Sequence, residues 1–181
     1  MAADIRPARA SDVDALLAIE NAVFPTDRLS GRSFRRLIAS PSAAVLVADA
    51  GKGVAGYAVL LVRAGSPTAR LYSIAAAPGV SGQGVGRALL GAAEREAARR
   101  GRRSLRLEVR EDNARAIAIY RLAGFEPTGR EADYYQDGMA AMRLKKELGG
   151  DAAASAGRGG KGTFPGSAGL SRLAEKIPGR A

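Results

Sequence analysis

The chain contains no cysteine, no histidine and no tryptophan. Without cysteine it can form no disulfide, no thiolate metal site and no thiol nucleophile. Without histidine it has no Ser-His-Asp triad, no imidazole metal ligand and none of the commonest general base. Any proton transfer must therefore use glutamate, aspartate, tyrosine, lysine, a chain terminus or water.

Long apolar runs are also missing. No run approaches the roughly 20 residues that span a bilayer. The first twelve residues, MAADIRPARASD, lack the apolar core of a secretion signal. These absences predict a cytoplasmic protein with no membrane partner.

Negative charge is scarce, because 28 lysines and arginines outnumber 18 acidic residues and give a formal net charge of +10. An anionic partner would explain this excess: nucleic acid, a ribosome or a phosphate-bearing cofactor. A compositional bias that enriches alanine, glycine and arginine together explains it equally well. No zinc-finger or RNP-type aromatic pattern is present, which argues against direct nucleic-acid binding.

The composition changes after residue 148. Residues 149–181 are rich in glycine, alanine and serine and poor in large apolar residues. Such a segment cannot bury enough surface to offset the entropy of ordering it. We therefore expect one folded domain over residues 1–148, followed by a disordered basic tail over 149–181.

Strand and helix patterns alternate through the domain, which predicts a mixed α/β fold with helices on both faces of a mainly antiparallel sheet. We expect one helix capped by Ser11, with Asp14 completing a capping box, and a second beginning at Ser30. The strands are expected at residues 5–8, 43–50, 54–63, 69–78, 104–110, 125–135 and 139–148, and two further helices at 85–101 and 113–124.

Three glycines, Gly82, Gly84 and Gly86, stand at alternate positions where the third helix begins. Glycines let a backbone approach a ligand closely, and a helix N-terminus favours negative charge, so this turn is typical of a phosphate cradle. The spacing fits neither the dinucleotide fingerprint nor the P-loop. The ligand must therefore be bound by another pattern.

The segments SIAAAPGV and SGQGVGRALL together resemble the acetyl-CoA-binding segment of the GNAT (Gcn5-related) N-acetyltransferases. The resemblance continues through LRLEVREDNARAIAIYRLAGF and DYYQDG and covers about residues 5–148. It is closest to the ribosomal-protein-alanine N-acetyltransferase branch. Two features depart from the family: Ser81 replaces its usual Arg or Gln, and DRLSG replaces a Pro-Trp-Ser segment that shapes the acceptor site.

The resemblance implies a GNAT fold, with about seven strands and a splayed central strand pair, and acetyl-CoA as cosubstrate without a metal. It implies that one strand end pairs with pantetheine through its backbone and that the glycine turn holds the pyrophosphate. The cosubstrate-binding residues would be Ile74, Ala75, Ala76, Gly82, Gln83, Gly84, Val85, Gly86, Arg87 and Asn113. Each also has a plainer role, in the core, at the surface or as a helix cap.

Two residues would carry the chemistry. Glu108 points away from the apolar face formed by Leu105, Leu107 and Val109, and the resemblance makes it the general base. Its plainer role is an ion pair with Arg106, Arg110 or Arg87. Tyr120 would be the general acid that protonates the CoA thiolate, or simply a core aromatic.

Tyr134 and Tyr135 would line the acceptor site or pack the closing strand. The implied function is acetyl transfer to a protein N-terminus, of the ribosomal-protein-alanine type. A small-molecule amine such as a polyamine, an amino acid or an antibiotic remains open as acceptor. A non-catalytic acyl-CoA-binding protein remains open as a third interpretation.

Overall fold

The structure, a computed structural model, describes residues 3–80, 82–149 and 171–172. Within these residues, seven strands form one sheet in the order β1-β2-β3-β4-β5-β7-β6, and a short eighth strand, β8, pairs with β4. The strands are β1 (Asp4–Pro7), β2 (Ala43–Asp49), β3 (Val54–Leu61), β4 (Thr68–Ala76), β5 (Ser104–Arg110), β6 (Glu126–Glu131), β7 (Ala141–Glu147) and β8 (Ser171–Arg172). All neighbours run antiparallel except β4 and β5, which confirms the mixed, mainly antiparallel sheet.

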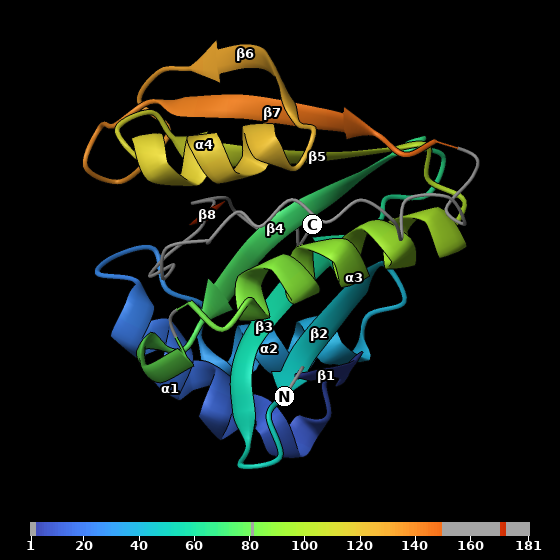
Figure 1. Cartoon of the computed structure of the whole chain (residues 1–181), viewed down its shortest axis with the longest axis vertical. Helices are drawn as coiled ribbons and strands as arrows, with labels where there is room; N and C mark the ends of the chain where they lie inside the picture. Colours follow the sequence, from blue (N-terminus) through green and yellow to red (C-terminus); the bar gives the residue numbers. More distant parts are fainter. Residues whose placement is uncertain (1–2, 81, 150–170, 173–181) are drawn as a thin grey trace, which may run out of the picture.

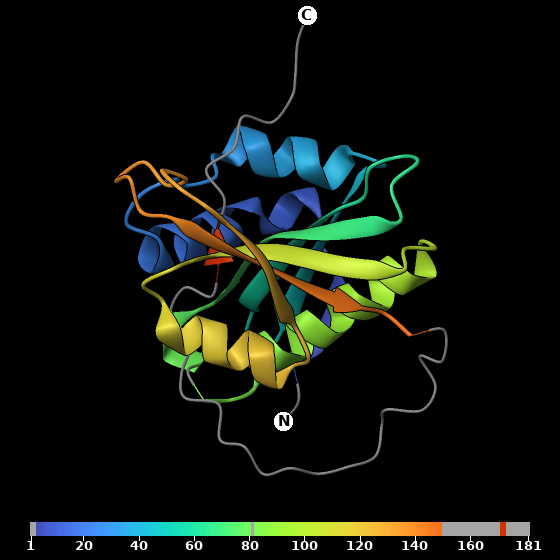
Figure 2. The same ribbon diagram turned by 90° about the horizontal axis from the view of Figure 1, so that it is seen from above.

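Helices cover both faces of the sheet (Figure 2). They are α1 (Val13–Val23), α2 (Gly31–Ala39), α3 (Val85–Arg99) and α4 (Ala114–Leu122), with short 3₁₀ turns η1 (Ala10–Asp12) and η2 (Pro78–Val80). None of the helices in the described part combines the length and apolarity needed to cross a bilayer.

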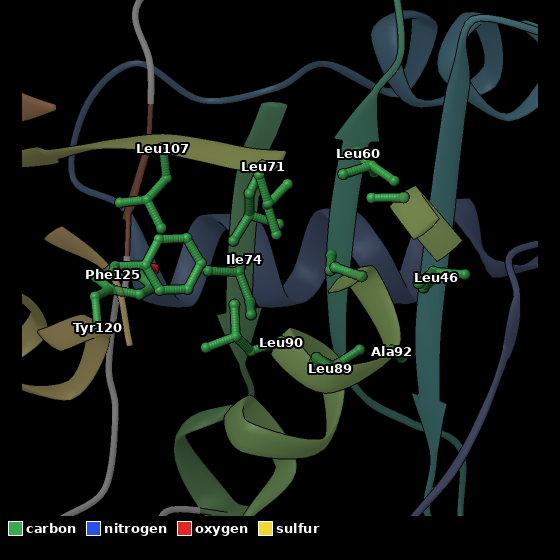
Figure 3. Close-up of a cluster of buried hydrophobic side chains, with 14 of the residues drawn as sticks. Leu46, Leu60, Leu71, Ile74, Leu89, Leu90, Ala92, Leu107, Tyr120 and Phe125 are labelled. Carbon is green, nitrogen blue, oxygen red and sulfur yellow. The ribbon is translucent and has the colours of Figure 1, made fainter. Parts of the chain in front are cut away.

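Two apolar cores result, one on each face of the sheet. The larger lies under α3 and α4 and includes Leu71, Ile74, Leu107, Tyr120 and Phe125, as Figure 3 shows. The smaller lies under α1 and α2 and includes Leu16, Phe34, Tyr57, Tyr72 and Ala75. Strand alternation explains the division, because successive side chains of β5 point to opposite faces.

Strand β4 breaks this alternation at Tyr72. Leu60 pairs with Leu71 and Val59 pairs with Ser73, so Tyr72 is an extra residue in the ladder between β3 and β4. Such a bulge bends its strand and increases the local twist. Beyond it, β4 leaves β5, and the two strands pair only where Thr68–Arg70 meets Ser104–Arg106. We call the divergence beyond this pairing the strand fork; it confirms the splayed central pair.

The predicted helix starts are half right. Ser30 caps α2, since its Oγ accepts a hydrogen bond from the Ser33 N–H at 3.1 Å. The cap at Ser11 with Asp14 is wrong, because Ser11 lies inside η1. The Asp12 side chain accepts from the Arg9 N–H at 2.7 Å instead. Asp12 also binds the Arg6 guanidinium, which holds the pKa of its carboxyl below the usual value.

The last predicted strand elements are also shorter than expected. Strand β6 ends at Glu131, so residues 132–135 form part of the connection to β7 rather than a strand. Of the predicted tail, Gly149 and β8 lie within the described residues, and the remainder lies outside them. The antiparallel ladder pairs Ser171 with Ile74 and Arg172 with Ser73, which brings this part of the tail to the strand fork (Figure 1).

Candidate active site

The glycine turn leads directly from the end of β4 into α3. Gly82 has φ +81° and Gly84 has φ +76°, a left-handed conformation that glycine adopts without strain. Gly84 is the N-cap of α3 and, as a glycine, has no side chain that could cap the helix. The first N–H groups of α3 therefore have no intrahelical or side-chain cap, which is the arrangement that binds anions.

Gly56 on β3 fixes where this helix begins. A Cβ at residue 56 would come within 2.8 Å of the Ala75 carbonyl oxygen and 2.9 Å of a Val85 methyl group. Only glycine therefore lets the start of α3 pack this closely on β3 and β4. Sequence analysis missed this residue; a lone glycine inside an apolar strand was the available signal.

The strand-end residues are buried. Ile74, Ala75 and Ala76 have side chains that are 3% exposed or less. One backbone edge of this part of β4 pairs with β3, and the other edge faces the strand fork, where β8 pairs at Ile74. These three residues thus offer a ligand only their backbone.

Glu108 projects from β5 onto the face opposite the larger core and is 1% exposed. Leu105, Leu107 and Val109 are fully buried on the other side, as the alternation predicted. A buried carboxylate needs partners, since desolvating an unpaired charge is costly. Glu108 is therefore expected to have cations around it.

Three arginines supply this charge. Arg70 donates from Nε to Glu108 Oε2 at 3.1 Å, and Arg106 Nη1 donates to Oε1. Arg143 Nε lies 3.7 Å from Oε1. The predicted pair with Arg106 is thus present, whereas Arg110 pairs with Asp112 and Asp137. Arg70 and Arg143 were missed, because they lie on β4 and β7, far from Glu108 in sequence.

Tyr120 lies on the other side of β5 from Glu108. It is fully buried in the larger core, and its ring meets that of Phe125 edge to face at 5.8 Å (Figure 3). Asn113 caps the same helix, since its Oδ1 accepts from the Ala116 N–H at 3.1 Å, which confirms the predicted cap. The base and acid candidates therefore flank the strand fork from opposite faces.

Tyr134 and Tyr135 lie in the connection between β6 and β7, with ring centroids 5.1 Å apart. The Tyr134 hydroxyl accepts a hydrogen bond from Arg70 Nη2 at 3.0 Å, so Arg70 links it to Glu108. Tyr135 is 5% exposed and lies under the Arg110 guanidinium, 4.9 Å from its ring centroid. Both tyrosines are thus on the Glu108 face of the sheet.

In the described part of the chain, no group of three or more acidic residues is placed to hold a metal ion. Two parting strands, a glycine-rich helix start and a buried carboxylate thus make up the candidate active site of this mixed α/β fold. Comparison with known proteins shows which family has this fold and sequence.

The sequence profile of the acetyltransferase (GNAT) family matches residues 13–125. A putative [ribosomal protein bS18]-alanine N-acetyltransferase of Bacillus subtilis is 30% identical over 135 residues, which cover 75% of this chain and 88% of that protein. The crystal structure of the ribosomal-protein-S18-alanine N-acetyltransferase from Escherichia coli superposes with a TM-score of 0.72 at 29% identity, covering 80% of this chain and 93% of that one. A nourseothricin acetyltransferase superposes at 0.67 and 25% identity, covering 82% of this chain and 100% of that one.

The chain therefore belongs to the GNAT acetyltransferase family, and it is an N-acetyltransferase. Enzymes of this family use acetyl-CoA as the cosubstrate. The fold expected from the resemblance is confirmed.

Proposed function

We propose that the enzyme transfers the acetyl group of acetyl-CoA to the α-amino group at the N-terminus of a protein. The observation that carries this proposal is the position of Glu108 and Tyr120 on opposite faces of β5 beside the strand fork. The relatives named for the alanine of a ribosomal protein favour a protein N-terminus as acceptor.

Acetyl-CoA would bind along the edge of β4 that faces the strand fork, the edge at which β8 pairs with Ser73 and Ile74. The backbone of Ile74–Ala76 would pair with the pantetheine amides as an added strand does. The N–H groups from Gly82 to Arg87 would receive the pyrophosphate at the start of α3, because the helix dipole and the uncapped amides both favour an anion. Asn113 would contact the cosubstrate in addition to capping α4.

The chemistry would be a direct transfer. Glu108 would take a proton from the acceptor ammonium, directly or through water. The neutral nitrogen would then attack the thioester carbonyl, and it would lose its second proton to solvent as the amide forms. The C–S bond of the tetrahedral intermediate then breaks. Tyr120 gives its proton to the departing thiolate and regains one from solvent. Most of the acceleration would come from holding the two substrates together.

A small-molecule amine is the alternative acceptor. The nourseothricin acetyltransferase shares this fold, and the segment Asp27–Gly31 between α1 and α2 differs from the Pro-Trp-Ser pattern of the protein-acetylating branch. Because this segment lies on the Glu108 face, where an acceptor would enter, it is the part of the chain in which the two acceptor classes would differ most.

The test is release of CoA thiol, measured with a thiol-reactive dye. The enzyme has no cysteine, so the dye reports only CoA. Unblocked peptides with different first residues form one set of acceptors, and small primary amines form another. Release that depends on the first residue of a peptide supports the proposal, whereas release with small amines alone moves the function to metabolite or drug acetylation.

A further inference from the structure

The surroundings of Glu108 pose an electrostatic problem for an acceptor amine. An amine reaches the enzyme mainly as an ammonium cation, yet Glu108 already has three arginine partners. Like charges repel strongly where water is scarce. An ammonium group therefore needs another anionic partner before Glu108 can take its proton.

Most carboxylates on this face already pair with arginines. Asp112 and Asp137 both bind Arg110. Glu131 binds Arg143, the same arginine that approaches Glu108. Because arginines already neutralise these carboxylates, they attract an incoming cation only weakly.

Asp27 differs from them. It lies in the connection between α1 and α2, with a left-handed backbone at φ +55°. Its Oδ2 accepts a hydrogen bond from the Thr26 hydroxyl at 3.2 Å. Its Oδ1 is buried and has no hydrogen-bond partner in the described part of the chain, nor is Asp27 in any salt bridge found there. A buried carboxylate oxygen without a donor is costly, and such costs concentrate at functional sites.

The Tyr135 hydroxyl is a second buried polar group without a partner among the described residues. Its ring is fixed from two sides, by Tyr134 and by the Arg110 guanidinium. Burial raises the pKa of Tyr135 above its usual value of about 10, and the charges of Glu108 and Asp27 add to this effect. Asp27 lies in the α1–α2 connection and Tyr135 in the β6–β7 connection, and Figure 2 shows these two connections at the same side of the molecule.

We propose that the Asp27 carboxylate and the Tyr135 hydroxyl together bind the ammonium group of the acceptor before Glu108 accepts its proton. Both oxygens can accept hydrogen bonds, and a primary ammonium has three N–H donors to give. The carboxylate also offsets the arginines around Glu108. This inference rests on the proposed function and assigns the acceptor side of the same site.

The substitution Asp27→Asn tests the charge without changing the backbone. Asparagine adopts the left-handed conformation as readily as aspartate, so the loop keeps its shape. We expect kcat/KM for the acceptor to fall roughly 10- to 100-fold, the loss typical of a hydrogen bond to a charged group. The KM for acetyl-CoA should stay within twofold of the wild type, since Asp27 lies on the acceptor side.

The matched control is Asp133→Asn. Among the described residues, Asp133 also has a left-handed backbone, at φ +51°, and it is exposed in the connection between β6 and β7. The same substitution there should leave acceptor kinetics unchanged. Tyr135→Phe removes only the hydroxyl and should lower kcat/KM about tenfold or less. The double variant Asp27→Asn with Tyr135→Phe should lose less than the two single losses combined, because both groups bind one ammonium.

Two probes separate this inference from the proposed function: an unblocked hexapeptide that begins with alanine, and spermidine. Each is titrated calorimetrically into enzyme saturated with CoA, and turnover is measured separately. Absence of turnover with every acceptor would overturn the proposed function alone. Equal binding of both probes by wild type and Asp27→Asn, or no binding by either protein, would overturn the ammonium site even if turnover is intact.

Discussion

Two buried glutamates on the same side of the sheet have opposite surroundings. Glu20 on α1 is fully buried, and the partners that the structure shows are the Leu29 N–H at 2.5 Å and the Tyr57 hydroxyl. Glu108 is equally buried but has three arginine partners. Glu20 therefore joins parts of the fold, whereas Glu108 lies among charges at the strand fork.

The difference lies in what each carboxylate connects. Glu20 ties α1 to the connection before α2 and, through Tyr57, to β3 and the Ser73 hydroxyl at 3.2 Å. Glu108 is connected through Arg70 to the Tyr134 hydroxyl on the acceptor side. Burial alone therefore does not distinguish a candidate general base from a structural carboxylate, whereas the partners and the neighbouring strand geometry of the two glutamates differ.

The largest effect is expected from Glu108→Gln. Loss of the general base should lower kcat about 10²- to 10⁴-fold, since the amide cannot accept the proton. The free energy of unfolding should fall by about 1–3 kcal/mol, because the glutamine oxygen still accepts from the arginines but the charge that they pair with is lost. Steady-state kinetics and urea unfolding measure both. Unchanged turnover would show that Glu108 is not the base.

The converse substitution, Glu20→Gln, should affect stability. It replaces a carboxylate oxygen with an amide that faces a donor, so the free energy of unfolding should fall by about 2–4 kcal/mol. The folded fraction should keep a kcat within about threefold of the wild type. Glu126→Gln, at an exposed position in β6, is the control. A hundredfold loss of kcat with intact stability would assign Glu20 to catalysis and contradict its assignment as a structural carboxylate.

High pH tests the Glu20 network through Tyr57. Burial raises the pKa of Tyr57 above its usual value of about 10, although the Ser73 hydroxyl lowers it. The folded state thus retains the phenolic proton that the unfolded state loses near pH 10. Stability from this group is complete below pH 10 and should decline as pH rises above it. Tyr57→Phe should flatten this decline in unfolding experiments from pH 8 to 11, and an unaltered slope would contradict the assignment.

The smallest effect is expected from ending the chain after Leu148. Strand β8 pairs through two residues, so its loss should change the free energy of unfolding by less than about 1 kcal/mol. Because β8 uses the β4 edge at Ile74, its removal should lower the KM for acetyl-CoA by about two- to fivefold. A raised KM would mean that the tail assists cosubstrate binding.

Local patterns predicted much of this molecule. The alternation in β5 correctly assigned Leu107 to the core and Glu108 to the opposite face, and the caps at Ser30 and Asn113 are present. These features depend on neighbours within four residues. The local sequence is therefore sufficient to predict them.

Features that depend on distant segments were not predictable. Arg70 reaches Glu108 across a strand pairing 38 residues apart in sequence. Glu20 resembles an ordinary polar helix residue until the Leu29 N–H is placed beside it. The predicted cap at Ser11 failed for a more local reason, because Asp12, which pairs with Arg6, accepts a hydrogen bond from the Arg9 N–H instead. For Glu108 and Glu20, contacts with distant segments decided which of several locally possible partners each carboxylate has.

The extra residue at Tyr72 lies just beyond the point where β4 and β5 part. Past that point the two strands form no ladder with each other, so a ligand at the strand fork need not break hydrogen bonds between them. If the cosubstrate binds at this fork, as we propose, its binding surface is preorganised by a bulged strand rather than by a moving lid. Deleting one residue here would restore the alternation of β4 along its ladder with β3 and remove the local bend.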